Sequence, residues 1–144
     1  MQGKLEKFWR KYSADLENYE VFDFGVDKKT SEKLKDLILT GKKKATTGLW
    51  KEGTALPHVG SKAIILDYHK DPFAIIEYTQ IFSVSFKEIT EEYALLEGEN
   101  DSLEEWRVEH TIVFTHWLAA ENREFTEDTQ VVGHVFNLVY PLTN

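Results

Sequence analysis

The sequence predicts an α+β fold in which a curved or closed antiparallel β-sheet is flanked by helices. Residues 44–86 are rich in β-branched and aromatic residues, which is typical of strands. The segments on both sides of this region carry apolar residues at helical spacing, and a last strand is predicted over Val131–Tyr140. This order favours helices packed outside an antiparallel sheet. Because 144 residues contain no repeat and no Pro/Gly-rich linker, we expect one domain over 1–144.

Two helices are predicted before the strands. Apolar side chains recur at helical spacing within residues 1–20, at Leu5, Phe8, Trp9, Tyr12, Leu16 and Tyr19. A second helix is expected to begin at Thr30 or Ser31, whose hydroxyls can cap it, and to end at Gly41.

The central strands are predicted at Ala45–Trp50, Lys62–His69 and Phe73–Phe86. The turn residues in His69–Pro72 predict a hairpin between the last two. Because Phe73–Phe86 is long for one strand, we expect a bend or bulge near residues 79–83.

Two further helices are predicted after the strands. The first covers approximately Thr90 to Leu96, and the second begins at the capping box Ser102–Glu105 and runs to about Ala120. The second helix carries one apolar stripe, formed by Leu103, Trp106, His110, Val113, Phe114, Trp117 and Leu118. On this stripe His110 is expected to be a core histidine and not a catalyst.

The charge of the chain is distributed unevenly. The formal net charge is −8, but residues 1–54 hold 12 Lys/Arg and 9 Asp/Glu, whereas residues 55–144 hold 5 and 16. Phosphate neutralisation supplies most non-specific nucleic-acid affinity, so the acidic second part disfavours binding to long DNA. A small nucleotide or a short single strand in a basic cleft remains compatible with the charge. The sequence makes no prediction of oligomeric state.

The composition also bears on metals and location. The chain has no cysteine, so it offers no disulfide and no thiolate metal site, and its five histidines lack a ligand spacing such as HExxH. No metal and no cofactor are therefore predicted. The start of the chain lacks the apolar segment of a signal peptide, and no run reaches the length of a membrane span. We therefore expect a cytoplasmic protein without a membrane partner.

The segment 41–50 carries the densest cationic run, Lys42–Lys44, beside two threonines and Trp50. Lysines suit phosphate and tryptophan suits a stacked base, so Lys42, Lys44, Thr47 and Trp50 are candidate ligand contacts. A threonine hydroxyl becomes a nucleophile when a base takes its proton. The structural alternative is a solvated charge run after a helix C-terminus, followed by a core tryptophan.

A second polar cluster consists of acidic residues, at Glu97, Glu99, Asp101, Glu104 and Glu105. Glu97 and Glu99 are candidates to orient a lysine or to accept a hydrogen bond from a base amine. The alternative is a solvated acidic loop.

Gly41–Thr46 resembles the G-x-K-x-x-T signature of the ASCH domain, a relative of the PUA RNA-binding fold. Ala94–Glu99, and Ser102–Arg107 with His110, resemble the acidic loop and the Trp-bearing helix of longer bacterial ASCH proteins. The flanking strands are represented by Phe82–Ile89 and by the last strand. The resemblance covers most of residues 24–141 and leaves 1–20 as an added helix.

The resemblance implies a PUA-like β-barrel with a cleft in which Lys43 and Thr46 face the ligand. It implies a protein that binds RNA or a small modified nucleotide or nucleoside. A small bacterial branch hydrolyses N4-acetylcytidine with a Lys/Thr/Glu set, which would correspond to Lys43, Thr46 and Glu97, or Glu99 if the loop contains an insertion. The alternative is therefore a nucleoside amidohydrolase, and a metal-dependent ribonuclease is a weaker one.

Overall fold

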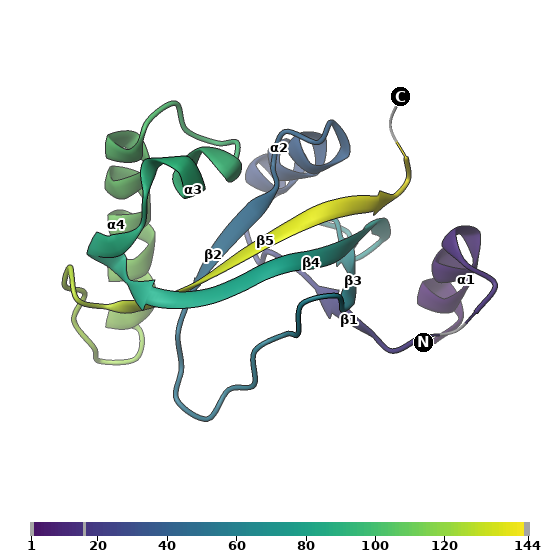
Figure 1. Cartoon of the computed structure of the whole chain (residues 1–144), viewed down its shortest axis with the longest axis horizontal. Coiled ribbons are helices and arrows are strands. Elements are labelled where there is room, and N and C mark those ends of the chain that lie inside the picture. The colour runs from purple at the N-terminus through teal and green to yellow at the C-terminus, as the bar shows by residue number, and fades with distance from the viewer. Residues whose placement is uncertain (1, 16, 143–144) are drawn as a thin grey trace.

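A five-stranded β-sheet with the order β1-β3-β4-β5-β2 forms the centre of the molecule (Figure 1). The structure is a computed structural model that describes residues 2–15 and 17–142. The strands are β1 (Tyr19–Phe22), β2 (Ala45–Leu49), β3 (Lys62–Leu66), β4 (Pro72–Ser85) and β5 (Gln130–Tyr140). β1 pairs with β3 in parallel, and all other pairs are antiparallel.

The sheet is open, so the expected closed barrel is not seen. Closure would require β1 to pair with β2, but in the described part of the chain these strands form the two edges. They contain only four and five residues, whereas β4 has 14 and β5 has 11. The two long strands β4 and β5 therefore form the centre of the curved sheet, and the shorter strands pair on either side of them.

The predicted hairpin and bulge are both present. β3 and β4 are antiparallel neighbours, and Lys70 in the turn between them has a φ of 67°. The β4–β5 register shifts between Tyr78 and Gln80, which leaves Thr79 as the extra residue.

The first helix, α1 (Gln2–Tyr12), is shorter than its apolar pattern predicted. Leu16 lies outside the described residues, and Tyr19 begins β1. The indole nitrogen of Trp9 donates to the carbonyl of Asp15 at 2.9 Å, so the chain folds back after the helix. The rings of Trp9 and Tyr19 then stack with centroids 5.0 Å apart. Tyr19 therefore packs on the helix from a strand instead of extending it.

The other helices begin at capped residues. Asp27 caps α2 (Lys28–Leu39) by accepting from the Thr30 amide, so this helix begins earlier than the predicted Thr30 or Ser31. Gly41 follows its end with a φ of 77°, as predicted. The short 3₁₀ helix η1 (Phe86–Glu88) leads to α3 (Glu91–Leu96), which Thr90 caps.

The last helix, α4 (Leu103–Ala119), begins at the predicted cap. The Ser102 hydroxyl accepts from the amide of Glu105 at 3.1 Å. The carboxylate of Glu105 reaches back one residue further than a capping box requires and accepts from the amide of Asp101 at 2.8 Å.

The helices cover different parts of the sheet (Figure 1). Ile38 of α2 packs in a cluster with Ala63 and Ile65, whereas Trp9 of α1 packs with Ile64 on the other face of β3. A third cluster joins α3 and α4 to one end of the sheet, and Ala45 at the start of β2 belongs to it. Among the described residues, no helix is both long enough and apolar enough to cross a membrane.

Candidate functional site

Lys43 lies in the short connection between α2 and β2, and its side chain is almost completely buried. The amides of Lys42 and Lys43 both donate to the carbonyl of Leu37 at 2.9 Å, and the Lys44 amide donates to the carbonyl of Leu96 at 2.7 Å. These bonds fix the α2–β2 connection against the last turns of α2 and α3. As a result Lys43 is 2% exposed, while its neighbours Lys42 and Lys44 face solvent.

Gly98 allows the acidic loop to lie directly on this connection. Its φ is 74°, and a Cβ atom there would lie 2.6 Å from the carbonyl oxygen of Lys42. Only glycine tolerates both the left-handed conformation and this approach. The two residues that flank Gly98, Glu97 and Glu99, are thereby brought over Lys43.

Lys43 forms ion pairs with both carboxylates. Its Nζ donates to Glu99 Oε2 at 2.8 Å, to Glu97 Oε1 at 3.3 Å and to the Glu97 carbonyl at 3.3 Å. Three acceptors match the three N–H bonds of an ammonium group. An ammonium in this arrangement has no lone pair with which to take a proton from Thr46.

Glu97 is the centre of a buried polar network. Its Oε2 accepts from the Thr47 hydroxyl at 2.6 Å and from the Trp106 indole nitrogen at 2.8 Å. Burial alone would raise the pKa of Glu97. The positive charge of Lys43 and the hydrogen bonds from His110 and Thr47 outweigh burial, and the pKa is lowered to about 2. Glu97 is therefore a buried carboxylate that stays ionised.

His110 faces an acceptor with each ring nitrogen. Nδ1 lies 2.8 Å from the carbonyl oxygen of Trp106, and Nε2 lies 3.4 Å from Glu97 Oε2. Burial lowers the pKa of His110, but the hydrogen bond to Glu97 and the charge of Glu97 raise it further, so the net shift is upward. Because a backbone carbonyl and a carboxylate only accept, the doubly protonated ring satisfies both contacts. The imidazolium also stacks on the Trp106 ring at 4.0 Å.

Thr46 and Thr47 differ sharply in their hydrogen bonds. The Thr47 hydroxyl donates a hydrogen bond to Glu97 and lies 2.8 Å from the Tyr93 hydroxyl. The Tyr93 hydroxyl in turn donates to the Thr46 carbonyl at 2.9 Å. Burial and the charge of Glu97 raise the pKa of Tyr93, which keeps its proton. In contrast, the Thr46 hydroxyl has no hydrogen-bond partner within the described part of the chain.

His134 lies opposite Thr46 on the neighbouring strand. The two residues are paired in the β2–β5 ladder, so their side chains share one face of the sheet. His134 Nδ1 donates to the Thr46 carbonyl at 3.2 Å. Burial lowers the pKa of His134 and the hydrogen bond to Thr46 does not offset it, so the ring is neutral near pH 7. Its Nε2 then carries a lone pair.

A cavity of about 160 Å³ lies between α2, α4 and the start of β2, and His134, Tyr93 and Trp106 are not among its lining residues. Its walls are formed by Phe24, Val26, Thr30, Leu34, Lys43, Thr46, Thr47, Glu97, Glu99, Glu109, His110, Val113, Phe114 and Trp117. Five predicted site residues therefore meet at one place, although Lys43 and Thr46 are not hydrogen-bonded to each other in the described structure.

The other predicted contacts lie outside this cavity. Lys42 and Lys44 are on the surface, and neither forms an ion pair with a described residue. Trp50 follows the far end of β2, about 13 Å along the strand from Thr46 at the usual rise per residue. The exposed aromatic ring at the cavity is Trp117 instead.

Sequence reasoning missed Tyr93, Glu109 and Trp117, and assigned His110 only to the core. Trp106 and His110 are four residues apart on α4, so they lie on the same side of the helix. The available signal for a polar site was the ring nitrogens of Trp106 and His110, which lie on a stripe that we had interpreted as apolar. Among the side chains that the structure describes, no group of three or more His, Asp and Glu is arranged to hold a metal ion.

A family model described as the ASCH domain matches residues 20–140. The chain belongs to the ASCH domain family. The crystal structure of an ASCH domain from Lactobacillus crispatus is 28% identical and superposes with a TM-score of 0.84, covering 96% of this chain and 93% of that one. A protein from Enterococcus faecalis V583 is 29% identical with a TM-score of 0.85, covering 97% and 92%.

More distant ASCH structures share the fold alone. The ASCH protein from Zymomonas mobilis is 12% identical with a TM-score of 0.51, covering 81% of this chain and 65% of that one. No curated protein matches the chain at comparable significance. The open sheet with its helices is thus the PUA-like ASCH fold, in which α1 precedes the matched region.

Proposed function

We propose that this ASCH domain binds a nucleobase, either of a short RNA or of a free modified nucleoside, in the cavity beside Lys43. The observation that carries the proposal is the meeting of Lys43, Glu97 and Glu99 with Thr46 in one small cavity. A volume of about 160 Å³ is below the roughly 300–1,000 Å³ typical of drug-sized ligands, so it suits one base better than a whole nucleotide. The suggested RNA binding of the family agrees with this ligand class.

The charges around the cavity favour a neutral base over a phosphate. Lys43 and protonated His110 supply two positive charges, whereas Glu97, Glu99 and Glu109 supply three negative ones. A phosphate inside would face uncompensated carboxylates. Lys42 and Lys44, which are exposed on either side of Lys43 in the sequence, are the candidates for phosphate contacts.

Glu99 and Trp117 give the cavity its selectivity for a base with an exocyclic amine. The Glu99 side chain is 23% exposed, so its carboxylate accepts further hydrogen bonds, as carboxylates do from the amine of cytosine. Trp117 is 42% exposed and offers a ring face for stacking.

The test compares nucleoside and short-RNA binding to the parent protein and to two tryptophan variants. Trp117→Ala should weaken binding about tenfold, as expected for one lost stacking contact. Trp50→Ala is the matched control, since Trp50 is similarly exposed, at 37%, but lies outside the cavity. Equal losses from the two variants would count against this cavity as the binding site.

Salt dependence tests the proposed phosphate contacts separately. For short single-stranded RNA, each contact should contribute about 0.7 to the slope of log affinity against log salt. Replacing Lys42 and Lys44 by Ala should flatten the slope and leave binding of an uncharged nucleoside unchanged.

A second candidate function is hydrolysis of an N4-acylated cytidine-like nucleoside, favoured by the Thr46 hydroxyl, which has no hydrogen-bond partner among the described residues. Thr46 Oγ1 would attack the acyl carbon, and its proton would pass to a base. The C–N bond would then break, the amine would leave with a proton, and water would hydrolyse the resulting ester. The Lys43 ammonium donates to three acceptors, so we propose neutral His134, which is paired with Thr46 in the β2–β5 ladder, as the base.

The hydrolase candidate is tested by turnover of acylated cytidines between about pH 6 and 9. Thr46→Ser should retain some turnover, whereas Thr46→Ala should lose nearly all of it while remaining folded. No turnover by the parent protein across a panel of acylated nucleosides would exclude this candidate and leave the binding proposal intact.

A further inference from the structure

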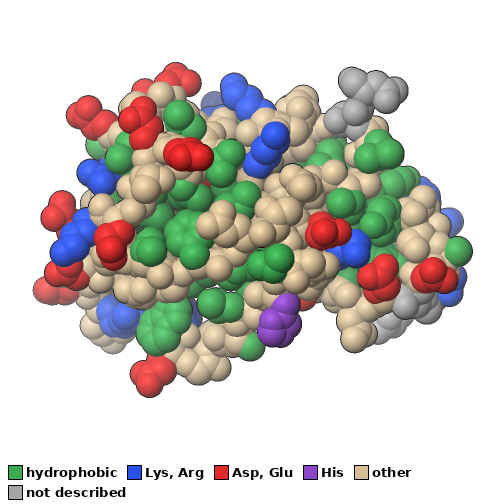
Figure 2. All heavy atoms as spheres, in the orientation of Figure 1, with side chains coloured by type: hydrophobic (Ala, Val, Ile, Leu, Met, Phe, Trp, Pro, Cys, Tyr) green, Lys and Arg blue, Asp and Glu red, His purple; other side chains and the backbone are tan. Residues whose placement is uncertain are grey.

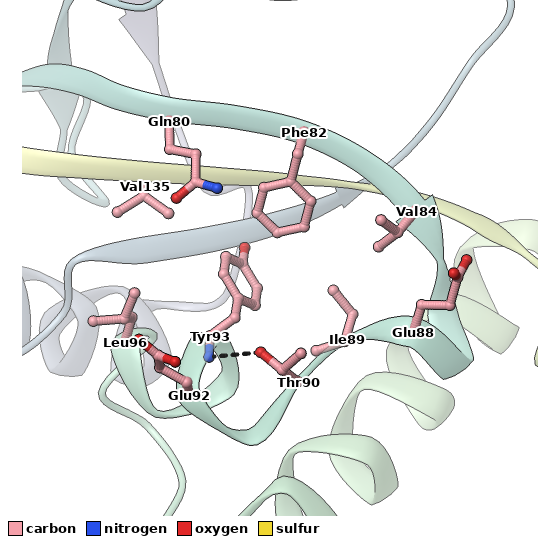
Figure 3. A pocket seen from close by; sticks show the side chains of 10 residues that line it. All are labelled: Gln80, Phe82, Val84, Glu88, Ile89, Thr90, Glu92, Tyr93, Leu96 and Val135. Carbon is pink, nitrogen blue, oxygen red and sulfur yellow. Dashed lines mark hydrogen bonds between the residues drawn. The ribbon is translucent and has the colours of Figure 1, made fainter.

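A second cavity of about 340 Å³ lies between β4 and α3 (Figure 3). It is separate from the cavity beside Lys43, and no residue lines both. In the space-filling view, which has the orientation of Figure 1, hydrophobic side chains gather on the visible face among acidic and basic ones (Figure 2). Its volume falls within the range of small-ligand sites.

Two aromatic rings form one wall of this second cavity. Phe82 and Tyr93 meet edge to face, with centroids 5.0 Å apart and planes at 84° (Figure 3). Phe82 lies against Gly133 of β5, where a Cβ atom would come within 2.4 Å of the ring. The Tyr93 ring is held in position because its hydroxyl contacts the Thr47 hydroxyl and donates to the Thr46 carbonyl. Both rings are therefore fixed in place before any ligand binds.

The rim of the cavity is acidic. Glu88 and Glu92 line it, and neither lysine nor arginine does. The Glu88 carboxylate already accepts from the Ser85 hydroxyl at 2.6 Å. Glu92 is exposed and forms neither an ion pair nor a side-chain hydrogen bond with any described residue. One carboxylate beside two aromatic rings is thus available to a ligand.

We propose that this cavity binds a small organic cation, an ammonium or guanidinium group carried on an apolar stem. The stem would pack on Phe82 and on the aliphatic side chains of Val84 and Leu96. The positive group would pair with Glu92 and lie near the rings, which attract cations through their π-faces. An anion would meet two carboxylates and no positive side chain.

Tyr93 connects this cavity to the proposed base site. Its ring lines the second cavity, while its hydroxyl contacts Thr47, which bonds to Glu97. A ligand that presses on the ring is therefore expected to shift the backbone amide signals of Thr47 and Glu97, although it touches neither residue.

The test is an NMR amide-shift titration of the full chain with phenethylammonium, its neutral analogue 2-phenylethanol and the anion phenylacetate. A second arm uses N-acetyl-arginine amide, which distinguishes a peptide side chain from a free amine as the source of the cation. We expect saturable shifts at Phe82, Ile89 and Tyr93, with a cation affinity several times that for the alcohol and no saturation by the anion. Binding by either cation supports the proposal.

Glu92→Gln and Glu91→Gln form the matched pair of variants. Both are exposed in the first turn of α3, but only Glu92 lines the cavity. Glu92→Gln should weaken cation binding about two- to fivefold, an effect that added salt should also produce in the parent. The proposal is overturned if the alcohol binds as well as the cations, if the largest shifts lie at residues of the cavity beside Lys43 and not at Phe82, Ile89 and Tyr93, or if the two variants behave alike.

Discussion

His110 and Glu97 form an ion pair in which Glu97 is buried and His110 is half-buried, and its protonation state follows from geometry. The Nε2 atom of His110 lies 3.4 Å from the Glu97 carboxylate, while Nδ1 faces the carbonyl of Trp106 at 2.8 Å. A neutral ring would direct a lone pair at one of these acceptors. The charged ring therefore balances Glu97 together with Lys43, and it gives the site a dependence on pH.

The first prediction is that His110 titrates above its ordinary pKa of about 6.5 and His134 below it. Glu97 raises the pKa of His110, whereas burial lowers that of His134. The ring protons of both residues are resolvable in a single NMR pH titration. An order in which His134 titrates above His110 would contradict the assignment of the imidazolium.

The raised pKa of His110 also predicts how stability changes with pH. A group whose folded pKa exceeds the unfolded value stabilises fully below about pH 6.5, and this contribution is lost as the pH rises through the folded pKa. The stability advantage of the parent over His110→Gln should therefore fall in that window by up to about 1.4 kcal/mol per pH unit. Urea unfolding at several pH values measures it. Glu97, with its pKa near 2, remains ionised throughout this window.

The second prediction concerns the Lys43–Glu97 pair. Lys43→Met leaves two carboxylates without their cation and should cost about 3–5 kcal/mol. The double variant Lys43→Met/Glu97→Gln should cost clearly less than the sum of the single changes, because the two groups form one network. Lys42→Met is the control, since Lys42 is exposed and should change stability by less than about 0.5 kcal/mol. Additive losses in chemical denaturation would contradict a direct coupling.

The third prediction separates backbone strain from steric clash at Gly98. Gly98→Ala meets the carbonyl of Lys42, whereas Gly25→Ala has a similar φ of 66° and nothing within 4 Å. Gly25→Ala should cost about 1 kcal/mol from strain alone. Gly98→Ala should cost more than this and should also weaken nucleoside binding, because Glu97 and Glu99 must move. Equal losses of stability would show that the approach of the loop to Lys42 is unimportant.

The sequence predicted the helices and strands better than it predicted whether the sheet closes into a barrel. Strands β2 to β5 and helix α3 followed from local composition, and Gly41 and Ser102 marked helix ends through local backbone chemistry. The open sheet could not be read from the sequence, because whether β1 meets β2 depends on long-range pairing. Tyr19 misled the helix prediction because a residue that packs on a helix carries the same apolar signal as one within it.

The residues of the candidate site were likewise only partly predictable from the sequence. Lys43, Thr46 and Glu97 were chosen as candidates through short motifs, and they line one cavity. Trp50 is not part of this cavity, because the extended chain of β2 places residue 50 far from residue 46. The partners of Glu97 on α4 depend on how that helix packs, which no local pattern specifies.

The last prediction uses the two adjacent threonines as a matched pair. Thr46→Val and Thr47→Val each replace a hydroxyl by a methyl group at nearly constant volume. Thr47→Val removes a 2.6 Å hydrogen bond from a buried, ionised carboxylate and should cost about 1–3 kcal/mol in denaturant unfolding. Thr46→Val removes a hydroxyl without a described partner and should leave stability nearly unchanged, yet it should reduce base binding or turnover because that hydroxyl lines the cavity. A loss of stability from Thr46→Val as large as that from Thr47→Val would mean that the Thr46 hydroxyl serves the fold and not a ligand.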